Sequence, residues 1–205
     1  MIFWGIDVGF SDMARRNTAL LVIDMQNDFI LEDGLLSVKG SKSIVSNVKR
    51  SLEIARHRGY LIVWVVREHD PSGRDADLFR RHLYLNGKQG PVVKGSYGAE
   101  IVDGLDINDG EYKIVKTRFS AFLNTHLHSV LMAEGVKDLV IVGVQTPNCV
   151  RQTCFDGVSL DYESVTVLVD ATAAQTPDVH EANLSDMRNV GVITYTVEEW
   201  ADSPN

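Results

Sequence analysis

The residue with the clearest potential for chemistry is Cys149, which lies between an expected strand and an expected helix. Residues 137–144 form a short β-branched run bounded by a charged pair, typical of a buried strand. Thr146 and Pro147 follow, and this order is typical of a helix N-cap and a first helical position. Cys149 would then lie in the first turn, where the helix dipole lowers a thiol pKa and free N–H groups can bind an oxyanion. A nucleophilic thiol and a small buried core residue both fit this position.

Two charged residues also follow expected strands and could act on that thiol. Asp24 follows the apolar run 18–23, and Lys116 follows the run 112–115. Sites in open α/β sheets form beyond the carboxyl ends of the strands, so both side chains could meet Cys149. A carboxylate can accept the thiol proton, and an ammonium group favours the thiolate. The structural alternatives are a helix cap for Asp24 and a solvated charge for Lys116.

Arginines and aromatic side chains near the same strand ends could bind a substrate. Arg67 and Arg118 each lie close to the end of an expected strand, and in a chain of net charge −8 they suggest a substrate carboxylate. The segment between them adds three arginines: Arg74, Arg80 and Arg81. Structural pairing of these arginines with nearby acids is the alternative. Phe29 and Phe119 could form an apolar wall for the substrate, and both also fit a plain core role.

Strand-like and helix-like stretches alternate along the chain and must position these residues. Apolar, β-branched runs predict strands at 18–23, 61–66, 112–115, 138–143, 165–169 and 192–195. Helical spacing of apolar residues, with glycine or Thr-Pro boundaries, predicts helices at 41–58, 121–134, 147–161 and 176–189. This alternation predicts an α/β fold with three layers, α/β/α, around a mostly parallel six-stranded sheet.

The length of 205 residues fits one domain. We expect residues 17–205 to form this domain and residues 1–16 to be an N-terminal extension. Within the extension, residues 1–12 should be dispensable, because nothing before the first expected strand carries a motif. The stretch 68–110 is polar and too long for an ordinary connection, so it predicts a lid or a partner-facing excursion.

Composition argues against several classes of partner. Twenty-eight acidic residues against 20 Lys and Arg make the chain a poor binder of nucleic acid or anionic membranes. No apolar run approaches the length of a membrane span. Two cysteines do not make a disulfide framework, which favours a reducing compartment, and the first residues lack a basic secretory leader. We therefore expect a cytoplasmic protein that acts on a small molecule.

Three ordered motifs occupy the expected strand ends: Asp-Met-Gln-Asn-Asp-Phe at 24–29, Lys-Thr-Arg-Phe-Ser-Ala-Phe at 116–122 and Gly-Val-Gln-Thr-Pro-Asn-Cys at 143–149. Together they resemble the isochorismatase-like cysteine hydrolase family, over residues 17–197. That family includes nicotinamidases, N-carbamoylsarcosine amidohydrolases and ureidoacrylate amidohydrolases. The resemblance implies the α/β/α fold and a homo-oligomer, either a dimer or a tetramer.

The resemblance also implies roles for particular residues. It implies a catalytic triad of Asp24, Lys116 and Cys149. The backbone amides of Gln145 and Cys149 would form the oxyanion hole, and the peptide bond before Gln145 would be cis. Every one of these positions matches the family motif in this sequence.

The chain departs from nicotinamidases within residues 67–71. Those enzymes carry an Asp-x-His pair and a second histidine downstream, which bind a divalent metal. Glu68 and Asp70 take the places of that pair here. We therefore expect no metal and no other cofactor, with His69 and His82 as surface or hydrogen-bonding residues; metal ligation by these two histidines is the alternative.

A cysteine nucleophile in this family implies C–N bond cleavage, because true isochorismatases cleave an enol ether and generally lack it. We expect Cys149 to attack a small amide, ureido or carbamoyl carbonyl and form a thioester, which water then hydrolyses. Asp24 would take and return the proton. Two other classes stay open: a catalytically inactive nicotinamidase-like protein that acts by binding or assembly, and a thiol-based sensor.

Overall fold

A computed structural model of the protein describes residues 17–85, 87 and 89–203. Six strands form one sheet in the order β3-β2-β1-β4-β5-β6, and every pairing between neighbouring strands is parallel. The strands are β1 (Thr18–Ile23), β2 (Leu61–Arg67), β3 (Tyr112–Lys116), β4 (Asp138–Val144), β5 (Ser164–Ala173) and β6 (Ile193–Tyr195). This confirms the predicted fold. The expected extension, with its dispensable residues 1–12, lies outside the described residues.

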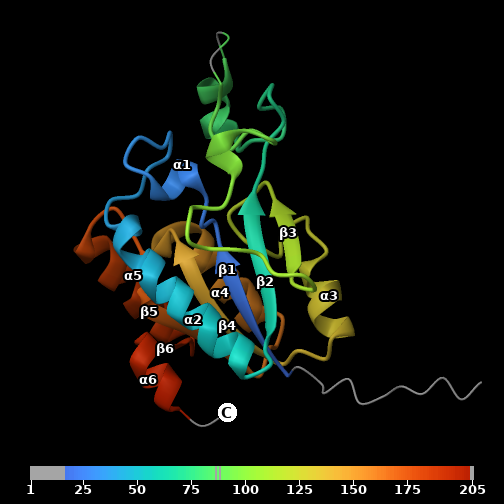
Figure 1. The fold of residues 1–205 in the computed structure, drawn as a ribbon, viewed down its shortest axis with the longest axis vertical. Coiled ribbons are helices and arrows are strands. Elements are labelled where there is room, and N and C mark those ends of the chain that lie inside the picture. Colours follow the sequence, from blue (N-terminus) through green and yellow to red (C-terminus); the bar gives the residue numbers. More distant parts are fainter. Residues whose placement is uncertain (1–16, 86, 88, 204–205) are drawn as a thin grey trace, which may run out of the picture.

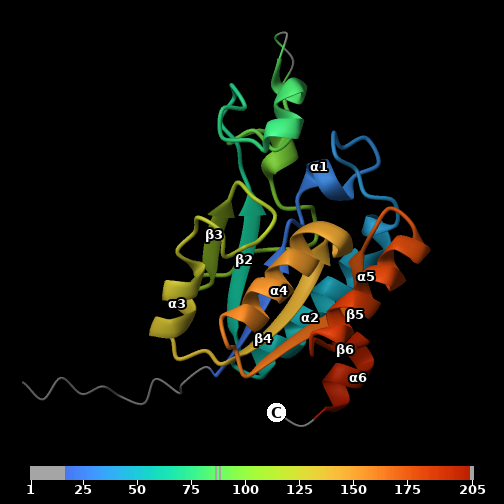
Figure 2. The same ribbon diagram turned by 180° about the vertical axis from the view of Figure 1, so that it is seen from behind.

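Helices cover both faces of the sheet (Figures 1 and 2). One face carries α2 (Val45–His57), preceded by η1 (Ser41–Ile44), and α6 (Val197–Asp202). The other face carries α3 (Leu127–Ala133), α4 (Arg151–Ser159) and α5 (Pro177–Asn189). Alternate residues of β1 enter the two cores, as a strand buried on both faces requires. Within the described residues no helix combines the length and the apolar character that a membrane span requires.

Helices α3 and α6 differ from the sequence prediction. Helix α3 begins at Leu127 rather than at 121, because the Thr125 hydroxyl donates to the Ala121 carbonyl and accepts from the Leu127 amide, closing a turn before the helix starts. Helix α6 was not predicted, although its capping box is visible in the sequence. The Thr196 hydroxyl accepts from the Glu199 amide, and the Glu199 carboxylate accepts from the Thr196 amide.

The predicted excursion 68–110 leaves the sheet after β2 and contains two short 3₁₀ helices, η2 (Leu78–Tyr84) and η3 (Tyr97–Ala99). Its green part in Figure 1 projects beyond the carboxyl ends of the strands, next to α1 (Asn27–Ile30). Gln26 ties the base of this segment to the sheet by donating to the Arg67 and Ala99 carbonyls, 2.8 Å each. The excursion is therefore anchored at the strand ends where the candidate site lies.

Candidate active site

The site lies where the strand order of the sheet reverses. The strand order places β1 beside β4, and the chain winds away from this pair on both sides. Asp24 directly follows β1, and Cys149 lies just beyond β4. Lys116 is the last residue of β3 and faces Arg67, the last residue of β2, in register. Four reactive or charged side chains from four strands therefore meet at one edge of the sheet.

The predicted triad residues come together in the interior. Lys116 Nζ lies 2.8 Å from Asp24 Oδ2, and both residues are 1% exposed. Lys116 also donates to the Arg118 carbonyl at 3.2 Å. Asp24 Oδ1 has no other hydrogen-bond partner within the described part of the chain, and Asp24 acts on the Cys149 thiol through its charge and a side-chain hydrogen bond. A buried carboxylate with one unused oxygen beside a thiol is suited to accept its proton.

The protonation of Cys149 is controlled by burial and by three neighbouring charges. Burial raises the pKa of the thiol, the negative charge of Asp24 raises it further, and Lys116 and Arg67 act in the opposite direction. The net result is a pKa above the ordinary value. The position in the first helical turn predicts a lowered pKa, whereas burial and Asp24 raise it.

The backbone around Cys149 differs from the α-helical turn that the sequence predicts. Residues Thr146–Val150 form a π-helical turn, η4, and α4 begins only at Arg151. Gln145, not Thr146, is the N-cap residue, because the Thr146 hydroxyl pairs with His180 Nδ1 at 2.8 Å instead of capping the turn. The peptide bond between Val144 and Gln145 is cis, as the resemblance implied.

The hydroxyl of Thr153 fixes η4 from the next turn of the chain. It donates to the Cys149 carbonyl at 2.7 Å and accepts from the Ala121 amide at 3.0 Å. The segment that carries the thiol is thereby connected to the loop after β3. Such a link restricts the positions that the Cys149 backbone can take.

The four predicted substrate-binding candidates separate in the structure. Arg67 is fully buried, and its Nη2 lies 3.7 Å from Cys149 Sγ. Phe119 lies beside it, with the Arg67 guanidinium 5.5 Å from the ring centroid. Arg118 instead donates to the Asp75 carbonyl at 2.5 Å and therefore braces the excursion. Phe29 packs in the core on the α2 side, whereas Cys149 packs in the core on the other side.

Asp77 is one of the acids for which the sequence left open a structural pairing with the arginines, and the structure shows that pairing. Its Oδ2 lies 3.1 Å from Arg67 Nη1, and its Oδ1 lies 3.8 Å from Arg118 Nε. Burial alone would lower the pKa of Arg67, but Cys149, Asp24 and Asp77 together raise it. The sequence predicts such a pairing as an alternative, but which acid pairs with Arg67 depends on how the excursion folds back onto β2.

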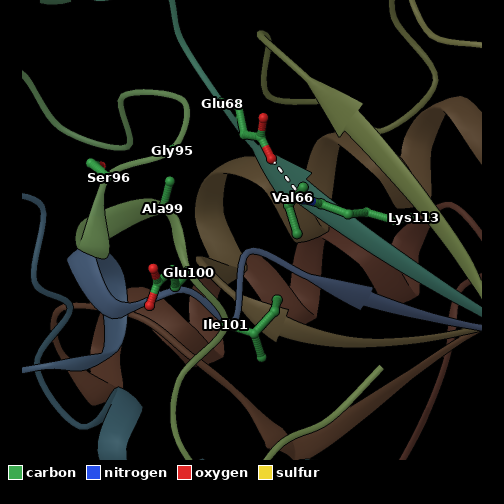
Figure 3. Close-up of a pocket in the computed structure, with 8 residues that line it drawn as sticks. All are labelled: Val66, Glu68, Gly95, Ser96, Ala99, Glu100, Ile101 and Lys113. Carbon is green, nitrogen blue, oxygen red and sulfur yellow. Dashed lines mark hydrogen bonds and ion pairs between the residues drawn. The ribbon is translucent and has the colours of Figure 1, made fainter. Parts of the chain in front are cut away.

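The residues in the place of the nicotinamidase metal ligands point in different directions. Glu68 pairs with Lys113 at 2.7 Å (Figure 3), and Lys113 lies three residues before Lys116, so it points to the opposite face of the sheet. Both line a cavity of about 260 Å³ that is separate from the thiol. His69 Nδ1 lies 3.3 Å from Asp75, and His82 is exposed. Among the described residues no group of three His, Cys, Asp or Glu side chains could hold a metal ion. These residues do not fit the nicotinamidase metal.

Comparison with known proteins gives a consistent set of relatives. Residues 18–199 match the family model of the isochorismatase domain. A protein of Arabidopsis thaliana named probable inactive nicotinamidase is 65% identical over 188 residues, which cover 91% of this chain and 96% of that one. A ureidoacrylate amidohydrolase of Caulobacter vibrioides is 33% identical over 182 residues, covering 80% of each chain. The crystal structure of an isochorismatase family protein from Desulfovibrio vulgaris is similar with a TM-score of 0.88 at 43% identity, covering 91% of this chain and 97% of that one.

Proposed function

The chain belongs to the isochorismatase family of hydrolases, and we propose that it is a cysteine-dependent amidohydrolase. It would cleave a C–N bond of a small amide, ureido or carbamoyl substrate. The observation that carries this proposal is the buried cluster at the strand ends, with Lys116 2.8 Å from Asp24 and Arg67 3.7 Å from the sulfur of Cys149. The ureidoacrylate amidohydrolase among the relatives supports the reaction class.

The charges of the cluster suit proton transfer from Cys149 to Asp24. When the thiol proton moves to the unused oxygen of Asp24, one buried anion replaces another and the total charge stays the same. Lys116 and Arg67 then face the new thiolate, so no charge is left uncompensated. The sulfur attacks the substrate carbonyl carbon, and the backbone amides of Gln145 and Cys149 receive the oxyanion.

Asp24 then returns the proton to the leaving nitrogen. The C–N bond breaks and the acyl group stays on Cys149 as a thioester. A water molecule attacks the thioester carbonyl while Asp24 takes its proton, and the thiol is restored as the acid leaves. Lys116 would hold Asp24 in place throughout, through its 2.8 Å contact.

The alternative is a protein that binds but does not catalyse. The name of the Arabidopsis relative favours it, since that protein is called a probable inactive nicotinamidase. Two observations separate the possibilities in this chain. Glu68 and His69 are engaged by Lys113 and Asp75, which argues against nicotinamide turnover through a metal. The clustered triad residues, in contrast, argue for turnover of another amide.

A substrate screen with hydroxylamine trapping tests the proposal. Simple amides, ureas and N-carbamoyl amino acids are incubated with the protein, and hydroxylamine added as a competing nucleophile should convert an acyl thioester into a hydroxamate. Cys149→Ser should lose both products while keeping its melting temperature. Cys154→Ser, at a buried cysteine that lies outside the cluster, should retain them. Full turnover by Cys149→Ser would remove the nucleophile assignment, and a reactive Cys149 without turnover of any substrate would favour the binding alternative.

A further inference from the structure

The charges around Cys149 do not balance. Lys116 is paired with Asp24, and Asp77 is shared between Arg67 at 3.1 Å and Arg118 at 3.8 Å. The other acids nearby have partners of their own, since Asp75 contacts His69 and Glu68 contacts Lys113. One further cation, Arg80, lies close enough to act electrostatically on the same groups. Four cations therefore share two carboxylates, in a chain whose net charge is −8.

Arg80 is the cation without an anionic partner. No ion pair or side-chain hydrogen bond joins its guanidinium to another residue in the described part of the chain. Two aromatic rings hold it instead, with centroids 5.3 Å (Phe119) and 5.1 Å (Phe79) from its guanidinium carbon. Burial and the charge of Arg67 lower the pKa of Arg80, while Cys149, Asp77 and Asp24 act in the opposite direction.

The ring of Phe119 connects Arg80 to the thiol. Arg67 lies over the same ring at 5.5 Å, and Arg67 Nη2 lies 3.7 Å from Cys149 Sγ. A small substrate whose carbonyl reaches the sulfur would place its substituents near this ring. A guanidinium group held over an aromatic ring can still donate hydrogen bonds to a ligand.

We propose that Arg80 is the specificity-determining residue of this site and binds a carboxylate on the substrate. This rests on the proposed hydrolase function and refines its substrate class to small acids that carry an amide, ureido or carbamoyl group. It also revises the expectation for Arg67 and Arg118. Both already engage Asp77, so a substrate carboxylate would have to compete with it there, whereas Arg80 is available. A guanidinium binds a carboxylate with two parallel hydrogen bonds, which suits this role.

Two alkylating reagents of nearly the same size test the proposal without any turnover. Iodoacetate carries a carboxylate and iodoacetamide a neutral amide; each forms a bond from sulfur to its CH₂ carbon as iodide leaves and the thiol proton passes to solvent. The measured quantity is the ratio of the iodoacetate rate to the iodoacetamide rate at Cys149, followed by mass spectrometry. The ratio cancels changes in the reactivity of the thiol itself. In the unaltered protein it should exceed the ratio for free glutathione.

Arg80→Leu should lower the ratio about tenfold, the size of one lost charge-assisted hydrogen bond. Arg80→Lys should give an intermediate value, because a point charge lacks the planar fork. Arg74→Leu is the matched control. It removes the same charge from the same segment, but Arg74 is 80% exposed and pairs with Asp70 at 2.9 Å, so the ratio should stay unchanged. If Arg80→Leu does not fold, Arg80→Gln serves in its place.

An unchanged ratio in the folded Arg80 variant would overturn the assignment, as would an equal fall in Arg74→Leu. Neither outcome depends on hydrolysis. If the ratio depends on Arg80 but the protein hydrolyses no substrate, the anion-site proposal stands and the proposed function fails. If the protein hydrolyses neutral amides but the alkylation ratio does not depend on Arg80, the proposed function stands and the anion-site proposal fails.

Discussion

The Cys149 thiol lies between one carboxylate and two cations, and its protonation depends on which of these charges is present. Burial and Asp24 raise its pKa, while Lys116 and Arg67 lower it. Removing one charged neighbour at a time should therefore move the reactivity of the thiol in opposite directions. This pattern distinguishes a tuned nucleophile from a cysteine that is merely buried.

Asp24→Asn should lower the pKa of Cys149, because a negative charge that favours the neutral thiol is lost. The rate of alkylation by iodoacetamide rises with pH as the thiolate forms, so its profile should shift to lower pH. Lys116→Met should shift it to higher pH, since a cation that favours the thiolate is lost. Alkylation rates measured across a pH series give both shifts.

The same Asp24→Asn variant should lose hydrolysis by about 10²–10⁴-fold, because the base that takes the proton is gone. Both variants break a buried ion pair, so thermal melts must show that each is folded under the assay conditions. Full hydrolysis by Asp24→Asn would show that another group is the base. Identical pH profiles for the three proteins would contradict the electrostatic account of Cys149.

Metal removal should leave hydrolysis of the preferred substrate unchanged, and nicotinamide should be a poor substrate. The reason is that Glu68 and Asp70, which take the places of the metal-binding pair, are paired with Lys113 and Arg74. Turnover before and after dialysis against a chelator, together with metal analysis of the purified protein, checks this. Activity that falls on chelation and returns with zinc or iron would overturn it.

Among the secondary-structure elements, a close approach between β1 and β4 places Asp24 and Cys149 at one edge. Gly143 adopts a φ of 112°, and a Cβ atom there would clash with the Ile23 carbonyl oxygen. Glycine is required because it tolerates this conformation and leaves room for the neighbouring backbone. The position comes directly before Val144, the last residue of β4.

Gly143→Ala should destabilise the protein by about 3 kcal/mol or more, because strain and a backbone clash act together. Gly135→Ala is the matched control. That glycine also has a positive φ, 76°, but a Cβ would meet nothing within 4 Å, so about 1 kcal/mol is expected. Urea unfolding midpoints of the two variants give the comparison. Equal losses would show that the contact with β1 is relieved at little cost.

At the scale of the whole molecule, the candidate site requires the excursion (residues 68–110) to stay packed against the sheet. Asp77 and Arg80 belong to the excursion, while Arg67 and Lys116 end strands. Gln26 makes the connection, since its side chain bonds the Arg67 amide at 2.7 Å and the Arg67 and Ala99 carbonyls at 2.8 Å. Asp28 adds a second tie by accepting from the Val92 amide at 2.6 Å.

Gln26→Ala should lower the free energy of unfolding by about 2 kcal/mol or more, because buried backbone groups lose their partners. It should also increase protease cleavage within residues 68–110, as the segment opens locally. Gln175→Ala is the control, since that exposed amide also bonds two backbone groups and should cost within about 0.5 kcal/mol. Unchanged proteolysis in Gln26→Ala would show that Asp28 is sufficient to hold the excursion.

The fold class and the meeting of Asp24, Lys116 and Cys149 at one edge of the sheet could be predicted from the order of the amino acids alone. Continuous apolar runs and turn signals are local properties, so β1, β2 and the Thr176-capped helix α5 are where they were predicted. Asp24, Lys116 and Cys149 could be named because the carboxyl ends of parallel strands meet at one edge. Helix starts were predicted less well, as at α3 and η4, because side-chain hydrogen bonds from distant or neighbouring residues set them.

The electrostatics of the site, in contrast, depend on tertiary packing. Burial of Cys149 reverses the pKa shift expected from its local position, and burial is a property of the packed core. Phe29 packs in the core on the α2 side, and Asp77 forms an ion pair with Arg67. Both placements depend on the path of the chain after a strand, which tertiary packing decides. Arg74 and Arg80 look alike in sequence, yet one is exposed and the other lies near the thiol without an anionic partner among the described residues. Pairing between charges depends on three-dimensional distance, which long-range packing alone sets.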